Sequence, residues 1–455
     1  MRWRVVLPLA VVLAVTGGAV FVVVDRNGSS PHRARAGVAP SPLRSPVLSG
    51  LAASEAPPSK LAVHDALGAA LRAMPAGEQV SGTVVDVDTG VTLWGRKAGT
   101  GVAPASTLKV LTAAAALRRL GPDYRFTTTT RLAGNTVYLV GGGDPTLAAS
   151  SSPADRPMRY PEPATLTELA SQTAAALPAG EPIHLRADTA GWSTPTLAKG
   201  WNEGYVAEGD VTPPSALELD GGRLRPGELD SPRTTDPAGQ AAAEFASLLG
   251  KDGVTVRGPI KKVTTPTAAT GLATVSSPPL AALVQRMLTD SDNDLAEALG
   301  RAVAVHDGQP PTFAGEVAAI TAELAPLGVA AGALALQDAS GLSHDDRVAP
   351  AALAAVLRSA AGSTPGMLRP LIEGLPVAGF TGTLADRYRG RHAGAGTGYV
   401  RAKTGSLVGV NALAGVVVDG SGRLLAFALM GSGTVETDAV QTGLDDMASA
   451  LAGLA

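Results

Sequence analysis

Apolar and polar residues recur along this chain with two different periods, which together predict a mixed α/β protein. Segments with apolar residues at helical spacing predict helices at 62–73, 106–120, 165–177, 238–249, 312–326, 349–360 and 436–453, and a helix–loop–helix at 278–304. Apolar and β-branched runs between Gly and Pro turns predict strands at 80–87, 91–97, 125–131, 136–140, 183–187, 253–257, 398–403, 406–418 and 423–430. We therefore expect strands at both ends of the globular part.

The N-terminus has a different pattern. Residues 5–24 carry no charge, and twenty residues at the helical rise span the apolar core of a bilayer. The run continues past the small residues Gly17-Gly18-Ala19, which favours an uncleaved signal anchor over a cleaved signal peptide. We thus expect a transmembrane helix within residues 1–26. Arginines on both sides of the run leave its orientation open.

The segment after this run, residues 27–60, is rich in Ser, Pro, Ala and Gly and has no sustained period. Such a composition is typical of a linker. The α/β pattern begins at Leu61, so the linker is expected to join the anchor to a globular part.

The composition of the chain excludes several classes of function and of catalytic chemistry. The 455 residues allow two or three domains, and a net charge of −3 gives no electrostatic footprint for nucleic acid. The absence of Cys excludes disulfides, thiolate metal sites and a cysteine nucleophile. The six His do not stand at metal-ligand spacing, so we expect no zinc chemistry.

The first candidate for catalysis is Ser106-x-x-Lys109 at the start of the predicted helix. Residues three apart on a helix share a face, so the lysine amine can reach the serine hydroxyl. A desolvated lysine can be neutral and act as the base that a serine nucleophile requires. Taken alone, the pattern favours an N-capping Ser beside an exposed Lys.

The second candidate is Ser291-Asp292-Asn293. Residues i and i+2 do not share a helix face, so Ser291 and Asn293 must lie in a loop if both point into a cleft. A helix is predicted from Asp294 onward. Taken alone, the triplet favours a turn that caps this helix.

The third candidate is Lys403-Thr404-Gly405-Ser406, between strand-like residues. In a regular strand Lys403 and Gly405 face one side and Thr404 the other. The glycine would let the backbone of a ligand approach closely, as an added strand requires. Taken alone, the segment favours an exposed strand lysine next to an edge glycine.

Together and in this order, the three motifs resemble those of the active-site serine penicillin-recognising enzymes, which include penicillin-binding proteins and class A β-lactamases. The long segment between Lys109 and Ser291 leaves room for an inserted domain, unlike the short helical stretch of a class A β-lactamase. No E-x-x-L-N segment follows Asn293 to supply a deacylating glutamate.

The chain is instead similar to the D-alanyl-D-alanine carboxypeptidase/endopeptidases, the class C low-molecular-mass penicillin-binding proteins. The resemblance covers about 61–455 and extends to the segments 139–147 (LVGGGDPTL), 214–217 (PSAL), 338–343 (DASGLS) and 382–384 (GTL). Two features depart from the family pattern: the insertion is shorter than usual, and His344 stands where the family tends to have Arg.

The resemblance implies a β-lactamase/transpeptidase-like α/β (α+β) domain, in which helices flank a central antiparallel sheet beside an all-helical part. An inserted mixed α/β domain would interrupt it. The expected division is therefore a catalytic domain in two pieces, 61–130 and 276–455, with the insertion at 131–275.

The resemblance also implies residue roles. Ser106 would be acylated by a peptidoglycan stem peptide with Lys109 as base, and Ser291 would relay a proton to the leaving nitrogen. The substrate-binding residues would be Asn293, Lys403, Thr404, Gly405 and Ser406. Backbone N–H groups of Ser106 and Ser406 would form the oxyanion hole.

The resemblance implies three further expectations. β-Lactams would inhibit the enzyme by acylating Ser106. No metal or organic cofactor would be required. The catalytic domain would lie outside the cytoplasmic membrane, anchored by the N-terminal helix, or be secreted if that helix is cleaved. Two alternatives stay open: a β-lactamase with the same Ser/Lys chemistry, or a catalytically weak binding or scaffold protein of the cell envelope.

Overall fold

The computed structural model describes residues 56–75, 78–150, 160–192, 197–228, 230–362, 366–388, 394–433 and 437–454. These residues belong to one compact unit, Leu51–Ala455. The predicted anchor and most of the predicted linker lie outside the described residues. Within the ranges given above, no helix combines the length and the apolar composition needed to cross a bilayer.

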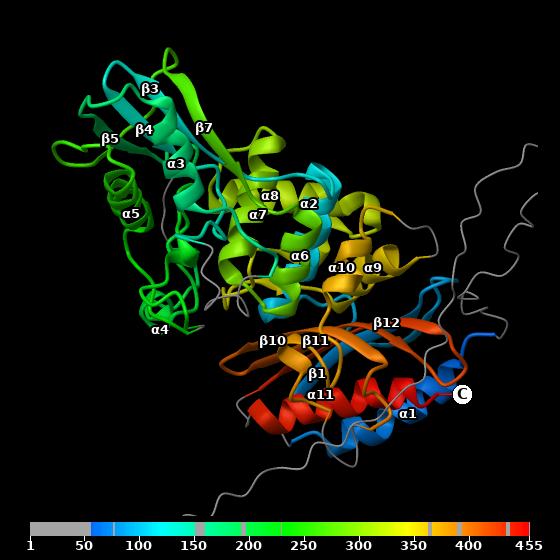
Figure 1. Ribbon diagram of the computed structural model, residues 1–455. Coiled ribbons are helices and arrows are strands. Elements are labelled where there is room, and N and C mark those ends of the chain that lie inside the picture. The colour runs from blue at the N-terminus through cyan, green and yellow to red at the C-terminus, as the bar shows by residue number, and fades with distance from the viewer. Residues whose placement is uncertain are drawn as a thin grey trace, which may run out of the picture. The chain divides into compact units, whose positions relative to one another are not determined.

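A five-stranded antiparallel sheet, in the order β10-β11-β12-β1-β2, joins the two ends of the globular part. Its strands are β1 Gln79–Asp86, β2 Thr92–Arg96, β10 Val400–Leu407, β11 Val410–Val418 and β12 Leu424–Ser432. Two helices, α1 Lys60–Ala73 and α11 Thr437–Ala452, cover one face (Figure 1). Apolar residues at helical spacing, such as Val63 and Leu67 of α1, pack there against strand residues such as Phe427.

A group of helices lies on the other face of this sheet (Figure 1). Its members are α2 Lys109–Leu120, α6 Leu280–Thr289, α7 Asn293–His306, α8 Phe313–Leu324, α9 Pro350–Ala361 and α10 Arg369–Gly374. Helix α2 is buried from Lys109 to Leu117, and its run of alanines leaves room for neighbouring helices to pack closely. The start of α2 is thus held between the helices and the sheet.

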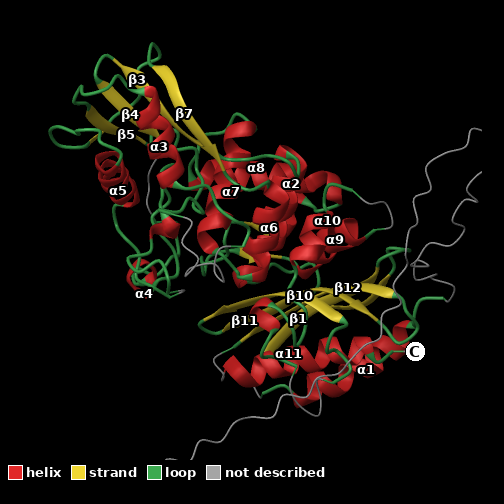
Figure 2. Cartoon of the chain, viewed as in Figure 1, coloured by secondary structure: helices red, strands yellow, loops and turns green. Residues whose placement is uncertain are grey.

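A second five-stranded sheet, in the order β6-β5-β4-β3-β7, is mixed (Figure 2). Its strands are β3 Thr127–Ala133, β4 Thr136–Val140, β5 His184–Asp188, β6 Lys261–Lys262 and β7 Thr270–Ser276. The helices α3 Leu166–Ala176 and α5 Pro237–Lys251 pack against this sheet. Thr127 pairs with Ser276, so the chain enters and leaves this sheet through adjacent strands. The mixed α/β class is confirmed, whereas the domain boundaries at 131 and 275 stay a prediction.

Several elements differ from the sequence predictions. The strand predicted at 253–257 is reduced to one bridge between Val256 and Ile183, because the chain there leaves α5 through Gly253 at φ 85°. The break expected between 403 and 406 lies instead at the turn between β10 and β11. The pattern also missed β7, α10 and the short elements α4 Tyr205–Glu208, β8 Leu334–Ala335 and β9 Arg347–Val348.

Candidate active site

Ser106 lies in a 3₁₀ turn, Ala105–Leu108, directly before α2. The preceding residue, Ala105, has φ 46°, a conformation that costs a non-glycine residue about 1–3 kcal/mol. The 338–343 segment packs tightly against Ala105 and holds this conformation, since a Cβ on Gly341 would overlap the Ala105 carbonyl. The surrounding structure therefore holds the residue directly before Ser106 in a strained conformation.

Lys109 is fully buried, and its Nζ lies within hydrogen-bond distance of three oxygens. These are Ser106 Oγ at 3.0 Å, Asn293 Oδ1 at 2.6 Å and the Ser340 carbonyl at 2.8 Å. Burial lowers the pKa of Lys109 to about 8, although nearby carboxylates, chiefly those of Asp338 and Glu297, oppose this shift. Lys109 can therefore lose its proton near neutral pH and accept one from Ser106.

Ser291 and Asn293 lie where α7 begins. Ser291 is in the turn before the helix at φ 60°, and Asn293 is the first residue of α7, one position earlier than predicted. Between them, Asp292 caps the helix by accepting a hydrogen bond from Leu295 N at 3.0 Å. The triplet thus combines the capping and the site interpretations, because its two outer residues reach the two buried lysines.

Hydrogen bonds hold the Asn293 side chain from two directions and the Ser291 side chain from one. The Asn293 amide group donates to the Asp210 carbonyl at 2.8 Å while its oxygen accepts from Lys109. Ser291 Oγ accepts a hydrogen bond from Lys403 Nζ at 2.9 Å. The start of α7 therefore joins α2 to β10.

Lys403 is fully buried in β10, and its Nζ also donates to the Thr404 carbonyl at 2.9 Å. Burial lowers its pKa well below the ordinary value, and the charge of Lys109 adds to this shift. The Thr404 and Thr383 hydroxyls lie 2.8 Å apart. Strand β10 pairs with β11 without a register shift, so Lys403 and Thr404 alternate as a regular strand requires.

Gly405 has a packing role in the structure, whereas the sequence predicts that it lets the backbone of a ligand approach. A Cβ there would lie 2.7 Å from the Pro104 carbonyl and 3.1 Å from Ser106 N. The glycine thus lets β10 pack directly against the turn that carries the nucleophile. Ser406, one residue further, is exposed and accepts a hydrogen bond from the Gln441 side chain at 3.0 Å.

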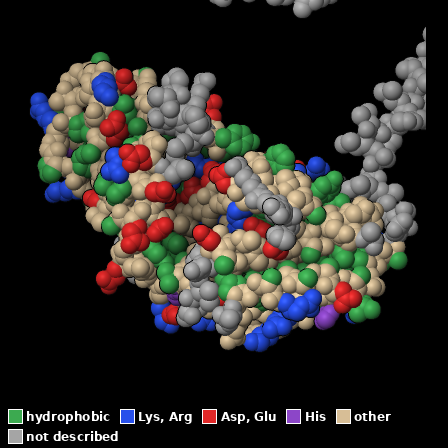
Figure 3. Space-filling view, turned by 90° about the horizontal axis from the view of Figure 1, so that it is seen from below, with side chains coloured by type: hydrophobic (Ala, Val, Ile, Leu, Met, Phe, Trp, Pro, Cys, Tyr) green, Lys and Arg blue, Asp and Glu red, His purple; other side chains and the backbone are tan. Residues whose placement is uncertain are grey.

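The margin of the site is acidic although its interior holds two lysines. Figure 3 shows acidic side chains over the region of α4, where exposed carboxylates include Glu203, Glu208, Asp210, Glu228 and Asp230. Burial raises the pKa of Asp210, and the neighbouring Glu208 and Asp230 raise it further. The two lysine amines of the site are thus buried behind an acidic margin.

The structure brings all eight predicted site residues to the junction of α2, α7 and β10. Sequence reasoning missed two backbone partners, the carbonyls of Ser340 and Asp210. Ser340 belongs to the 338–343 segment, which the sequence singled out only as a resemblance; Asp210 carried no signal. In the described part of the chain, no cluster of three or more His, Asp or Glu could hold a metal.

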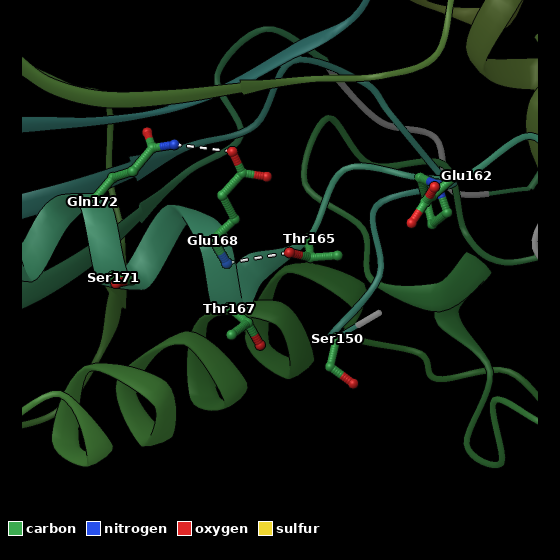
Figure 4. Close-up of a pocket in the computed structure, with 8 residues that line it drawn as sticks. Ser150, Glu162, Thr165, Thr167, Glu168, Ser171 and Gln172 are labelled. Atoms are coloured by element: carbon green, nitrogen blue, oxygen red, sulfur yellow. Dashed lines mark hydrogen bonds between the residues drawn. The ribbon is translucent and has the colours of Figure 1, made fainter. Parts of the chain in front are cut away.

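A polar hollow at the start of α3 contains none of these residues (Figure 4). Thr165 Oγ1 accepts a hydrogen bond from Glu168 N at 3.1 Å, and Gln172 Nε2 donates to Glu168 Oε1 at 3.0 Å. These bonds cap and brace the first turns of the helix. The polar side chains that line the hollow thus have a structural role in stabilising the start of α3.

The fold and the Ser/Lys constellation define a serine hydrolase of the β-lactamase/transpeptidase-like class. The profile of the D-Ala-D-Ala carboxypeptidase 3 (S13) family matches residues 63–232 and 227–454. The chain belongs to this family, which confirms the resemblance stated from the motifs.

Individual relatives agree. The chain is 38% identical to carboxypeptidase DacB of Mycolicibacterium smegmatis, over 97% of this chain and 95% of the relative. It is 30% identical to a D-alanyl-D-alanine carboxypeptidase of Actinomadura sp., over 78% of each. The crystal structure of penicillin binding protein 4 (dacB) from Haemophilus influenzae has the same fold, with a TM-score of 0.69 at 23% identity, covering 84% of this chain and 97% of that one.

Proposed function

We propose that this enzyme removes the terminal D-alanine from peptidoglycan stem peptides through an acyl-enzyme on Ser106. One observation carries the proposal: the amine of a fully buried Lys109 lies 3.0 Å from Ser106 Oγ. In the first step Lys109 takes the hydroxyl proton, and Ser106 Oγ attacks the carbonyl of the penultimate D-alanine. The peptide bond breaks and the terminal D-alanine leaves. Water then hydrolyses the ester.

The other site residues act on the bound peptide. Ser291 passes a proton to the leaving nitrogen, which is supported by its hydrogen bond to Lys403. Lys403 and Thr404 bind the terminal carboxylate, and Asn293 holds the peptide backbone. The N–H groups of Ser106 and Ser406 stabilise the oxyanion, which typically contributes two to three orders of magnitude in rate. β-Lactams acylate the same serine.

The location proposed for the enzyme follows from its substrate. Peptidoglycan lies outside the cytoplasmic membrane, so the catalytic part is exported, with the N-terminus inside. The uncharged run at residues 5–24 supports an N-terminal anchor.

The test uses the full chain and a diacylated Lys-D-Ala-D-Ala peptide, with released D-alanine as the readout. The unaltered chain releases D-alanine, and Ser106→Ala releases none. Rapid turnover of penicillin without D-alanine release would instead indicate the β-lactamase. Failure of the unaltered chain both to release D-alanine and to react with penicillin would overturn both enzyme assignments and favour a binding or scaffold protein.

A further inference from the structure

The loop formed by Asp338–Ser343, here called the 338–343 loop, lies directly against Lys109. The Ser340 carbonyl accepts a hydrogen bond from Lys109 Nζ at 2.8 Å. The amide groups of Ala339 and Ser340 donate to one carboxylate oxygen, Glu297 Oε1, at 3.2 and 2.9 Å. Ser340 is thus held by Glu297 on its amide side and holds Lys109 on its carbonyl side.

Glu297 is itself fixed from the opposite side. Arg301, one turn further along α7, donates to Glu297 Oε2 at 3.2 Å and to Glu316 Oε2 at 2.8 Å. All three side chains are at most 1% exposed. Burial raises the pKa of both carboxyl groups, and that of Glu316 lies well above its ordinary value. Glu297 accepts hydrogen bonds from two backbone amides as well as from Arg301, whereas Glu316 accepts from Arg301, so we assign the negative charge to Glu297 and the proton to Glu316.

The packing between α7 and the 338–343 loop leaves little freedom. A Cβ on Gly300 would lie 2.7 Å from Ala339 Cβ, so the loop approaches α7 more closely than an alanine would allow. Asp338 closes the loop internally, since its carboxylate accepts from Gly341 N at 2.7 Å and from Ser343 N at 2.8 Å. The loop is thus a rigid connection between Glu297 and Lys109.

We propose that Glu297 is a positioning residue for the acylation of Ser106. It holds the Ser340 carbonyl against the Lys109 amine and places a negative charge near that amine. This rests on the proposed role of Lys109 as base. Other carboxylates also act on Lys109, namely Asp338, Asp292 and Asp294. The amine of Lys403 is the other basic group of the site, and the charge of Lys109 lowers its pKa.

Two substitutions separate the two parts of this role. Glu297→Gln removes the charge and turns an amide NH₂ toward Arg301, so Lys109 becomes easier to deprotonate and less well held. Acylation should then fall about tenfold, and its rise with pH should move roughly half a pH unit lower. Glu297→Asp keeps the charge but shortens the reach to Ser340. It should slow acylation with the pH dependence nearly unmoved.

The matched control is Glu316→Gln. Glu316 shares Arg301 with Glu297 and is equally buried, and the Ala339 and Ser340 amides donate to Glu297 instead. Because it is the protonated member of the pair, its replacement should leave the pH dependence of acylation unchanged.

The experiment measures the second-order rate of acylation of the full chain by a fluorescent penicillin across pH, with melting temperatures of all variants. A downward shift in Glu297→Gln and none in Glu316→Gln supports the proposal. An unmoved profile in Glu297→Gln, or the same shift in both, overturns it. If Glu297→Gln does not fold, wild-type acylation by Glu297→Asp overturns it. Lack of acylation in the unaltered chain would overturn the proposed function itself.

Discussion

Lys403 Nζ donates a hydrogen bond to Ser291 Oγ at 2.9 Å, across 112 residues of sequence. The bond joins a buried strand lysine to the turn before α7. It gives the serine hydroxyl a fixed donor, so its lone pairs and proton are oriented before substrate arrives. This hydrogen bond supports the proposed role of Ser291 as a proton relay, whereas the neighbouring Asp292 caps the helix.

Replacing Ser291 with Ala should slow acylation by a fluorescent penicillin about a hundredfold, because general acid–base groups contribute on that order or more. The substitution also leaves Lys403 Nζ with one acceptor fewer. Ser421→Ala is the control, since that hydroxyl donates to Asp419 in a turn between β11 and β12. Acylation within threefold of the unaltered chain would rule out the relay.

Acylation should depend on pH through Lys109, whose pKa burial lowers to about 8. Only the neutral amine can accept the Ser106 proton, so the rate should rise about tenfold per pH unit below this pKa and level off above it. Rapid-mixing measurements of penicillin acylation between about pH 6 and 9 test this. A rate that is flat below pH 8 would contradict the assignment of the base.

Gly405→Ala should slow acylation at least tenfold, because the new Cβ meets the Pro104 carbonyl and displaces Ser106, and a small misplacement of a reacting group is costly in rate. The matched control is Gly271→Ala in β7, where a Cβ meets nothing within 4 Å. Acylation rates and melting temperatures of both variants are compared. Equal rates in the two would refute the packing argument.

The segment that follows α4 is tied to α7 by a buried ion pair. Arg233 Nη1 lies 3.2 Å from Asp294 Oδ2, and Thr212 N donates to Asp294 Oδ1 at 2.7 Å. Asp294 is adjacent to Asn293, so this tie also fixes an active-site residue.

Arg233→Met should lower the free energy of unfolding by about 3–5 kcal/mol, because it leaves the Asp294 charge buried without its partner. Urea unfolding measures this. The control, Arg225→Ala, breaks an exposed pair with Glu228 and should cost about 0–1 kcal/mol. A similar small loss in both variants would show that the buried pair does not stabilise the fold.

The sequence could predict the candidate site because each motif is local. Ser106 and Lys109 are three apart at a helix start, and the turn residues of the second motif also cap a helix, so short-range rules place them. The third motif can be placed only if its strand is predicted, and the long apolar run after it predicts strand structure in this region. The order of the three motifs then indicated the family.

The supporting contacts could not be predicted, because backbone atoms from distant segments make them. Nothing in the side chain of Ser340 or Asp210 indicates that its carbonyl binds Lys109 or Asn293. The sequence predicts that Gly405 makes room for the backbone of a ligand. In the fold, the atoms next to Gly405 belong to the Pro104–Ser106 turn. Such packing depends on the tertiary fold rather than on local pattern.

The central claim is that Ser106 becomes covalently acylated. Mass spectrometry of the full chain after incubation with penicillin, followed by tryptic digestion, tests it most directly. The account predicts one added penicillin per chain, located on the peptide 98–109 at Ser106 and absent from Ser106→Ala. Addition at another residue, or an unmodified chain, would contradict it.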